Sequence, residues 1–334
     1  MNVLLTCVGR RHYLADFFRA ARDVHTVVGT DMDLSVPALQ ACDIKVQLPG
    51  IFDPGYLNAL KEVVLAENIH MAFSLNDLEM GLLADNRIAL EQETRASFYV
   101  PPKSTLDVCV DKWCTFEYAR KIGIAVPETF LSVAGVMDAL ELGRIQFPLI
   151  IKPRWGSASI GLYTVETQAD LASGFEACQE AVAKSALSSL GAKDSVIIQE
   201  LIQGPEYGLD LLYGHQENFI GFTAKKKFAM RAGETDKAVT VAPEPFQEMV
   251  SKIAKALPHR GNLDCDVLER DGTFYLLEFN PRFGGGYPFT HLAGANHVQM
   301  LLDDYQGKAV GEYGYAVGKG FAKCDSLIPI PVIC

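Results

Sequence analysis

The pattern of apolar and polar residues predicts two kinds of sheet in this chain. Over about the first hundred residues, apolar runs at 2–8, 25–33 and 71–77 alternate with helical patterns such as 10–23. Strands that alternate with helices indicate a parallel sheet of Rossmann type. The turn after the first run has one glycine, Gly9, where a dinucleotide site would have G-x-G-x-x-G. Dinucleotide binding is therefore not supported.

From about residue 147 the pattern changes to short strands joined by glycine-bearing turns, which is typical of an antiparallel region. These runs are at 147–153, 162–166, 195–202, 207–214 and 218–228. Two prolines, Pro101 and Pro102, stop regular structure before a helical pattern begins and predict a domain boundary there. The fold class is therefore α/β at the front and α+β in the last third.

Composition and charge narrow the function to small-molecule chemistry. The 334 residues carry a net charge of -11, which argues against an extended nucleic-acid footprint. There is no signal-peptide pattern and no stretch of about twenty apolar residues, so we expect no membrane partner. The eight cysteines form no C-x-x-C pair. We expect buried, reduced thiols and a cytoplasmic protein.

The run 274–289, FYLLEFNPRFGGGYPF, has polar residues at every second position of an apolar strand. Alternate side chains share one face, so Glu278, Asn280 and Arg282 should converge. An Asp-Gly turn predicts a hairpin, in which Asp264 or Asp266 lies across from them. Hard oxygen ligands in this arrangement suit Mg²⁺, and Arg282 could neutralise charge on a transferred phosphoryl group. The alternative is a structural ion pair between Arg282 and Glu278.

A small-residue loop follows the strand that ends at Lys152. Its glycines, Gly156 and Gly161, leave backbone N–H groups free to contact phosphate oxygens. Leu162 stands where a P-loop would have lysine, so this is not a Walker motif. An ordinary glycine-rich hairpin is the alternative. Lys152 and Lys112, which opens a helix, each require an anion or water around their charge.

Three further segments are candidates for binding. The turn after the 195–202 strand offers the backbone of 200–202 to a purine and Glu206 to a ribose, although exposed acids beside a Gly-Pro turn are common. The segment 225–235 is predicted to place basic residues just before a glycine loop, where they bind a substrate anion or are merely solvated. We expect His291 to be structural. At the end of the third N-terminal strand, Asn76, Asp77 and Glu79 are expected to face the same cleft.

Taken in order, Lys112, IIKPRWGSASIG, IIQELIQGPEYGLD and LLEFNPRFGGG resemble the ATP-grasp superfamily, in the branch similar to the carbamoyl phosphate synthetase large subunit. The resemblance covers nearly the whole chain. It implies a Rossmann-like pre-ATP-grasp domain at 1–103, a small lobe with a phosphate lid at 104–199, and a C-terminal lobe with the metal site at 200–334.

The resemblance also assigns roles to residues. It implies catalytic roles for Arg282 and Lys152 and metal ligation by Asp264 (less favourably Asp266), Glu278 and Asn280. The ATP site that it implies comprises Lys112, Lys152, Gly156, Ser157, Ala158, Ser159, Gly161, Glu200, Leu201, Ile202 and Glu206. The substrate candidates are Lys225, Arg231, Gly285 and Gly286.

The function that these resemblances imply is an ATP-grasp ligase. It would use ATP with two Mg²⁺ ions, or Mn²⁺, to convert a carboxylate to an acyl phosphate that an amine or similar nucleophile attacks. The alternatives are a carbamoyl-phosphate-synthetase-like kinase of bicarbonate or carbamate, and a nucleotide-binding sensor without turnover. The expected partners are the two small substrates, and a homodimer is the expected assembly because dimers are the commonest oligomers.

Overall fold

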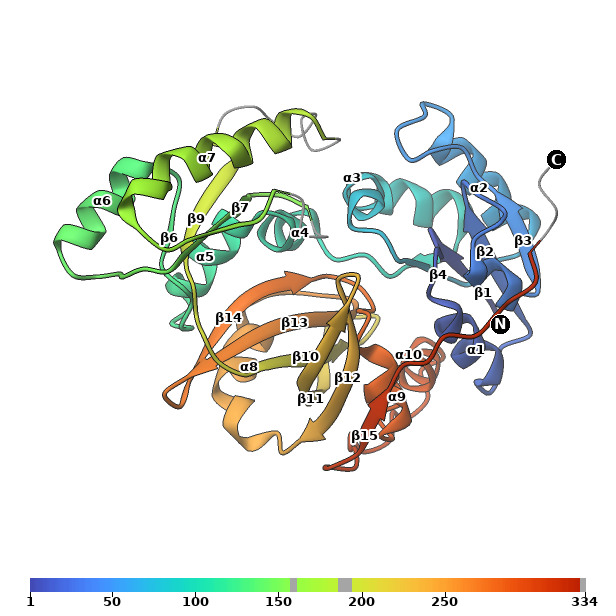
Figure 1. Cartoon of the computed structure of the whole chain (residues 1–334). Helices are drawn as coiled ribbons and strands as arrows, with labels where there is room; N and C mark the ends of the chain where they lie inside the picture. The colour runs from blue at the N-terminus through green and yellow to red at the C-terminus, as the bar shows by residue number, and fades with distance from the viewer. Residues whose placement is uncertain (157–160, 186–193, 331–334) are drawn as a thin grey trace.

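Three sheets surround a central space in the computed structural model of the chain, which describes residues 1–156, 161–185 and 194–330. Figure 1 shows the N-terminal sheet with its helices, a small lobe built on a four-stranded sheet, and a large six-stranded sheet below both. The mixed parallel and antiparallel architecture predicted from the sequence is confirmed.

The N-terminal sheet is parallel, with strand order β3-β2-β1-β4-β5. Its strands are β1 (Asn2–Thr6), β2 (Thr26–Asp31), β3 (Ile44–Gln47), β4 (Met71–Ser74) and β5 (Ser97–Phe98). The helical segments are α1 (His12–Ala20), the short 3-10 helix η1 (Pro37–Ala41), α2 (Tyr56–Ala66) and α3 (Asp77–Thr94). Asn76 caps α3, because its side chain accepts a hydrogen bond of 2.9 Å from the Leu78 N–H. This cap fixes the chain direction where β4 ends.

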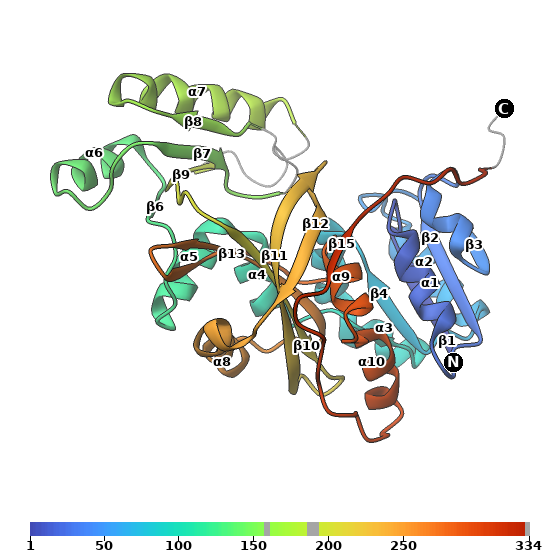
Figure 2. The same cartoon turned by 60° about the horizontal axis from the view of Figure 1, so that its bottom comes forward.

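The small lobe has the strand order β6-β9-β7-β8 and is antiparallel. Its strands are β6 (Thr129–Phe130), β7 (Leu149–Pro153), β8 (Tyr163–Val165) and β9 (Val196–Glu200). Two helices, α6 (Val133–Glu141) and α7 (Gln168–Ala183), bury their apolar sides against it. The other face is left toward the central space (Figure 2).

The large sheet has the order β14-β13-β10-β11-β12-β15 and is also antiparallel. Its strands are β10 (Glu206–Tyr213), β11 (Phe219–Arg231), β12 (Glu234–Val241), β13 (Gly261–Arg270), β14 (Thr273–Asn280) and β15 (Gly320–Ala322). The remaining helices are α4 (Lys103–Val110), α5 (Lys112–Lys121), the 3-10 helix η3 (Glu244–Phe246), α8 (Gln247–Ala256), α9 (Tyr287–Leu292) and α10 (His297–Tyr305). The predicted Asp-Gly turn joins β13 to β14, with positive φ at Asp271 (52°) and Gly272 (78°).

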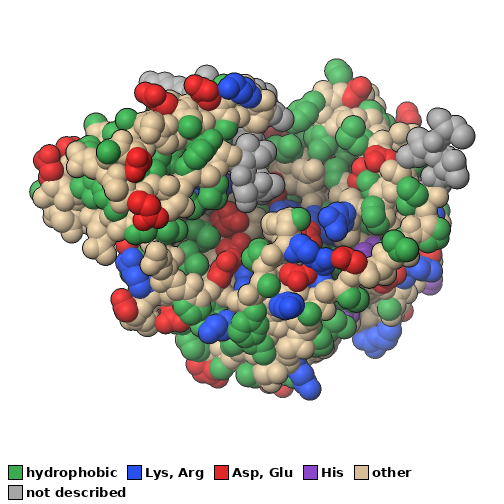
Figure 3. Space-filling view, viewed as in Figure 1, with side chains coloured by type: hydrophobic (Ala, Val, Ile, Leu, Met, Phe, Trp, Pro, Cys, Tyr) green, Lys and Arg blue, Asp and Glu red, His purple; other side chains and the backbone are tan. Residues whose placement is uncertain are grey.

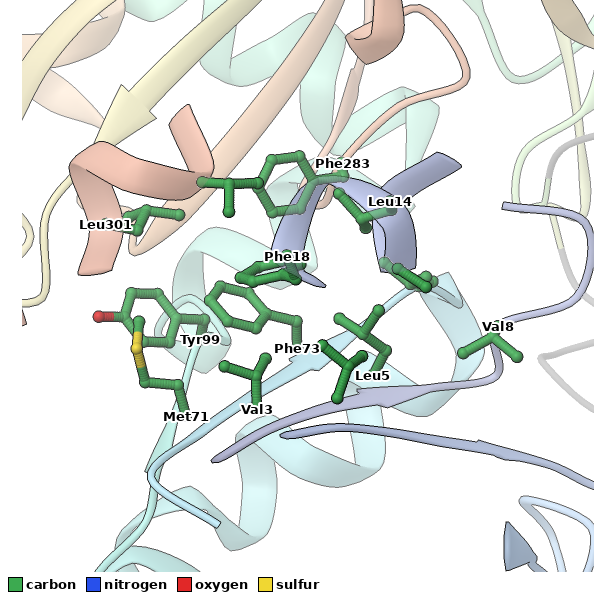
Figure 4. Close-up of a cluster of buried hydrophobic side chains, with 14 of the residues drawn as sticks. Val3, Leu5, Val8, Leu14, Phe18, Met71, Phe73, Tyr99, Phe283 and Leu301 are labelled. Atoms are coloured by element: carbon green, nitrogen blue, oxygen red, sulfur yellow. The ribbon is translucent and has the colours of Figure 1, made fainter. Parts of the chain in front are cut away.

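The core of the N-terminal domain extends into the C-terminal helices. Val3 and Leu5 point to one face of the sheet, where they pack with Phe18 of α1 and with Phe283 and Leu301 from the far end of the chain (Figure 4). The opposite face packs on α2 and α3. This shared core fixes the N-terminal domain against the large sheet, so side chains from both can line one site.

Several simpler expectations can be compared with these elements. Residues 225–231 belong to β11 and stand directly before the turn at Ala232 and Gly233 that leads into β12, as the sequence predicts. The seven cysteines in the described part of the chain are free thiols. In that same part, no helix is both long enough and apolar enough to cross a bilayer. The three domain boundaries stay predictions.

Candidate active site

A cavity of about 440 Å³ lies where the three sheets meet. Figure 3 shows the hollow on this face of the molecule, with acidic and basic side chains gathered at its mouth. Most of the predicted site residues line it: Lys112, Lys152, Gly156, Glu200, Leu201, Ile202, Glu206, Asp264, Asp266, Glu278, Asn280, Arg282, Gly285 and Gly286. Residues separated by up to 174 positions in the sequence, from 112 to 286, therefore share one surface.

Lys152 is the most unusual side chain of this cavity. It is only 8% exposed, and it makes no hydrogen bond or ion pair with any residue that the structure describes. Burial, together with the charge of Lys112, lowers the pKa of Lys152 to about 8, while Glu278 acts in the opposite direction. A buried cation without a partner is costly unless an anion reaches it. Lys152 is therefore suited to bind an anion in the cavity.

Lys112 lies in the first turn of α5, as predicted, where its positive charge is unfavourable toward the helix dipole. Two contacts offset this. Asp111 caps the helix, because its carboxylate accepts the N–H groups of Trp113 at 3.0 Å and Cys114 at 3.3 Å. The Lys112 ammonium donates to the Gly156 carbonyl at 2.5 Å. This contact holds one end of the small-residue loop beside the cavity, where N–H groups would suit a phosphate.

The predicted phosphate loop is only partly described. Ser157, Ala158 and Ser159 lie outside the described residues. Gly161 has a positive φ of 64°, and a Cβ there would lie 3.1 Å from the side chain of Ala181 in α7. Gly161 is not among the residues that line the cavity. The positive φ and the close approach of α7 explain why residue 161 is a glycine.

The hinge between β9 and β10 forms another wall. Leu201 and Ile202 line the cavity, and Glu200 is held by Arg270 at 2.6 Å. A Cβ on Gly204 would lie 1.8 Å from the carbonyl oxygen of Glu269, so only glycine fits at this turn. The hinge thus presents backbone and apolar groups to the cavity, while the Glu200 carboxylate is already paired with Arg270.

Carboxylates and an amide gather on β13 and β14. Asp264 pairs with Asn280 and Asp266 with Glu278 in the register of the two strands, and the amide of Asn280 donates to Asp264 at 3.4 Å. Burial and the charges of Asp266 and Asp210 raise the pKa of Asp264 to about 7, against the opposing charges of Lys225 and Lys227. A buried acid in this situation gains from a bound cation.

Asp266 differs from Asp264 because it already has a cation. The ammonium of Lys227 contacts Asp266 and also Glu206, the second at 2.8 Å. Burial lowers the pKa of Lys227, but the charges of Asp266, Asp264 and Glu206 outweigh it and the net shift is upward. Sequence reasoning missed this lysine as a partner of both predicted acids. Strand alternation in β11, which puts Lys225 and Lys227 on one face, was the signal.

Arg282 is held by the N-terminal domain. Its Nε lies 2.8 Å from Oδ1 of Asp77, and its terminal nitrogen donates to the other carboxylate oxygen at 2.9 Å. The alternative ion pair with Glu278 is not formed. Asp77, at the start of α3, reaches the cavity only through this contact with Arg282 and does not itself line it, so the expectation that it faces the cleft stays a prediction. Glu79 is fully buried and accepts hydrogen bonds from Thr6, Ser74 and Tyr56. The expectation for Glu79 was wrong.

Arg11 is a cavity residue that sequence reasoning missed. It comes from the turn before α1, donates to the carbonyl of Leu75, and lies 3.7 Å from Glu234. Its Nε has no hydrogen-bond partner among the described residues. Arg11 and Arg282 both line the cavity, and burial together with the charge of Arg282 lowers the pKa of Arg11.

Two of the four predicted substrate contacts have other roles. Lys225 is fully buried in an ion pair with Asp210, which also accepts from Thr290, so the prediction that Lys225 contacts substrate is wrong. Arg231 does not line this cavity and pairs with Asp236 at 3.0 Å and Asp325 at 2.6 Å. His291 is structural as expected, since it stacks on Phe17 at 3.7 Å.

The glycine run at the cavity edge has a packing reason. A Cβ on Gly284 would lie 2.2 Å from the Asp264 carboxylate, and one on Gly285 would lie 2.8 Å from Glu234. These close approaches bring both acids to the cavity wall. Among the described residues, no group of three His, Cys, Asp or Glu side chains is arranged to hold a metal ion by itself. A cation at this place would also need the Asn280 amide oxygen and oxygen atoms from a bound small molecule.

Two family models match the chain. The model described as "PylC-like, N-terminal domain" matches residues 3–95, and the one described as "ATP-grasp domain" matches residues 145–290. Together they cover the N-terminal sheet and most of the cavity.

Individual proteins are similar to this chain over most of its length. The chain is 25% identical over 266 residues to a D-alanine–D-alanine ligase of Bacillus anthracis, covering 72% of this chain and 83% of that protein. A biotin carboxylase of Campylobacter jejuni has a similar structure, with a TM-score of 0.71, 16% identity and coverage of 92% and 72%. So does N5-carboxyaminoimidazole synthetase of Staphylococcus aureus, with a TM-score of 0.71, 14% identity and coverage of 93% and 78%.

Proposed function

Because residues 145–290 match the ATP-grasp domain model, we propose that this chain is an ATP-grasp ligase that depends on ATP and Mg²⁺ and joins a carboxylate to an amine through an acyl phosphate. One observation carries the proposal. The buried Lys152, which has no partner among the described residues, lies in the same cavity as Glu278, Asp264 and Asn280. A phosphate-binding cation beside hard oxygen ligands is the arrangement that a metal-bound nucleoside triphosphate requires.

The nucleotide contacts follow from the cavity walls. Adenine would lie against the hinge of Glu200, Leu201 and Ile202, and the ribose beside Glu206. Lys112, Lys152 and the backbone at Gly156 would contact the phosphates. The described residues suit this division, because apolar and backbone groups form the hinge end and cations form the loop end.

The residues present also fit Mg²⁺. Asp264, Glu278 and Asn280 would hold it, because Asp266 already pairs with Lys227, whereas the buried Asp264 forms no ion pair with a described residue. Glu278 makes no hydrogen bond or ion pair within the described chain, which leaves its carboxylate free. We propose two ions, with Mn²⁺ able to replace Mg²⁺. Bound metal would supply charge neutralisation on the phosphates.

The chemical steps need little beyond positioning and charge. A carboxylate oxygen attacks the γ-phosphorus of ATP, the bond to the bridging oxygen breaks, and ADP leaves. Arg282 and Arg11 contact the transferred phosphoryl group and the acyl phosphate. The amine nitrogen then attacks the acyl carbon, the carbon–oxygen bond to phosphate breaks, phosphate leaves, and the nitrogen loses a proton to solvent.

The test is product analysis with panels of acids and amines. ADP and phosphate should form together, in equal amounts, only when an acid, an amine and ATP are all present. AMP and pyrophosphate would contradict the acyl phosphate. Phosphate release that needs bicarbonate and no amine would instead favour the bicarbonate or carbamate kinase. Full function of a Glu278→Ala variant in cells would favour the sensor.

A cytoplasmic location and a homodimer complete the proposal. Both follow from the sequence expectations, and sedimentation velocity of the purified chain would test the second. A monomer at micromolar concentration would contradict the homodimer.

A further inference from the structure

A second cavity, of about 350 Å³, lies next to the first. The two share Ala232, Glu234 and Thr235, which belong to the turn and first residues of the β11–β12 hairpin. The rest of the second cavity is built from the start of α1, from α9 and from the segment that begins in β15. Figure 2 shows β12, β15 and α9 side by side, which explains how these distant segments enclose one space.

The acids of the second cavity already have cations. Glu234 is held by Lys323 at 2.8 Å, and Arg231 pairs with both Asp236 and Asp325. Arg10 also lines the cavity and is exposed. Unlike Arg231 and Lys323, it forms no ion pair with a described residue. The cavity therefore keeps one free cation on its rim, which is suited to a ligand carboxylate.

One wall of the cavity is apolar. Pro288, Phe289 and Leu292 of α9 face Phe321 and Ala322 of β15 across it. Leu292 is 57% exposed and so leaves apolar surface open on this wall. A ligand with an apolar side chain would cover this wall.

Two of the three residues shared by the cavities are polar, Glu234 and Thr235. Glu234 lines both, and Arg11 of the first cavity lies 3.7 Å from its carboxylate. The Tyr13 hydroxyl is buried in the second cavity and has no hydrogen-bond partner within the described residues. Burial raises the pKa of Glu234, but its hydrogen bond with Lys323 and the charges of Lys323, Arg11 and Arg282 outweigh this and hold it low. Lys323 contacts Oε2 of Glu234, whereas the described cation at Oε1 is Arg11, 3.7 Å away, so Oε1 and the Tyr13 hydroxyl are the acceptors left for an ammonium group.

We propose that the second cavity binds the amine substrate as an α-amino acid with an apolar side chain. Its ammonium group contacts Glu234, its carboxylate contacts Arg10, and its side chain packs on Phe289 and Phe321. The identification as a substrate rests on the proposed function, and on the three shared residues, which put this cavity next to the one proposed to hold the acyl phosphate. The binding mode itself needs no turnover.

The experiment measures binding by isothermal titration calorimetry on the full chain with three probes. L-leucine has both charged groups, isoamylamine lacks the carboxylate, and isocaproate lacks the amine. Each is titrated into the natural chain, Glu234→Gln and Arg10→Ala. The matched controls are Glu248→Gln, which removes an acid paired with Lys252 outside both cavities, and Arg19→Ala, which removes another arginine of the α1 region.

The proposal predicts a crossed pattern. Both variants should weaken L-leucine about tenfold or more, the loss expected for one charge-assisted contact. Only Glu234→Gln should weaken isoamylamine, and only Arg10→Ala should weaken isocaproate, while the controls bind like the natural chain. Because Arg10 lines the second cavity alone, its effect assigns the site.

Equal binding by all variants, or no binding of L-leucine at about 10 mM, would overturn the proposal. The binding result can be told apart from the test of the proposed ligase activity. The crossed pattern without ADP release with any acid would leave the site and remove the ligase. ADP release with an acid but without the crossed pattern would do the opposite.

Discussion

The contact between Arg282 and Asp77 offers a sharp test of how the N-terminal domain serves the cavity. Arg282 is 10% exposed in its side chain and Asp77 is 28% exposed, and their two contacts are 2.8 and 2.9 Å long. We predict that Asp77→Asn lowers kcat/KM for ADP formation, because the amide keeps only one acceptor oxygen and the Arg282 fork loses its fixed direction.

The magnitude follows from the kind of contact. A hydrogen bond to a charged group contributes about 1.5 to 3 kcal/mol, and the partial exposure of Asp77 favours the lower half of that range. A loss of about 2 kcal/mol in the transition state corresponds to about a 30-fold fall in kcat/KM.

A coupled assay of ADP release, with the acid and amine that give the fastest turnover, measures the effect. Asp107→Asn is the matched control, because Asp107 pairs with Lys103 on an exposed helix away from the cavity. Arg282→Lys keeps the charge without the fork. If Asp77 acts only through Arg282, then Asp77→Asn added to Arg282→Lys should cost little more.

The reasoning is refuted if Asp77→Asn retains the natural kcat/KM while Arg282→Lys loses it. An equal Asp77→Asn loss in both backgrounds would also refute it, because Asp77 would then act independently of Arg282.

Three further predictions concern the cavity and its support. Lys152→Met should raise the KM for ATP at least tenfold. In the natural chain the KM for ATP should rise as pH increases through about 8, because the Lys152 ammonium loses its proton above its pKa of about 8. Initial rates measured from pH 7 to 9.5 check both expectations. A pH-independent KM would contradict this role. Glu278→Gln should raise the Mg²⁺ concentration for half-maximal activity about tenfold or more and reduce the thermal shift caused by Mg²⁺ and ADP, whereas an unchanged Mg²⁺ titration would remove Glu278 from the metal site. Lys225→Met should destabilise the fold by about 3 to 5 kcal/mol in urea unfolding, because it leaves Asp210 as a buried unpaired charge; Asp210→Asn in the same chain should restore part of the loss, and no restoration would refute the pairing.

The parts of the site that lie on one hairpin could be predicted from the sequence. Period-2 alternation and an Asp-Gly turn are local signals, and they placed Glu278 and Asn280 across from Asp264 and Asp266 in the observed register. Lys112 and Lys152 were predictable for a similar reason, since an apolar strand or a helix start makes an unpaired cation conspicuous.

The contributions that depend on packing between domains could not be predicted in the same way. Arg11 looks like an ordinary charge before a helix, and only the shared core around Phe18, Phe283 and Leu301 brings it to the cavity. Lys225 and Lys227 lie on one face of a strand, but their burial depends on Asp210 and Asp266 from neighbouring strands. Long-range pairing of this kind is set by tertiary structure and has no local pattern.

The acyl phosphate is the central claim, and oxygen transfer tests it most directly. The acid that supports the fastest ADP release is prepared with ¹⁸O in its carboxylate and turned over with ATP and the amine. Attack by the carboxylate on the γ-phosphorus predicts one ¹⁸O atom in each phosphate released, and none in the nucleotide. Label in AMP, or phosphate without label, would contradict the account.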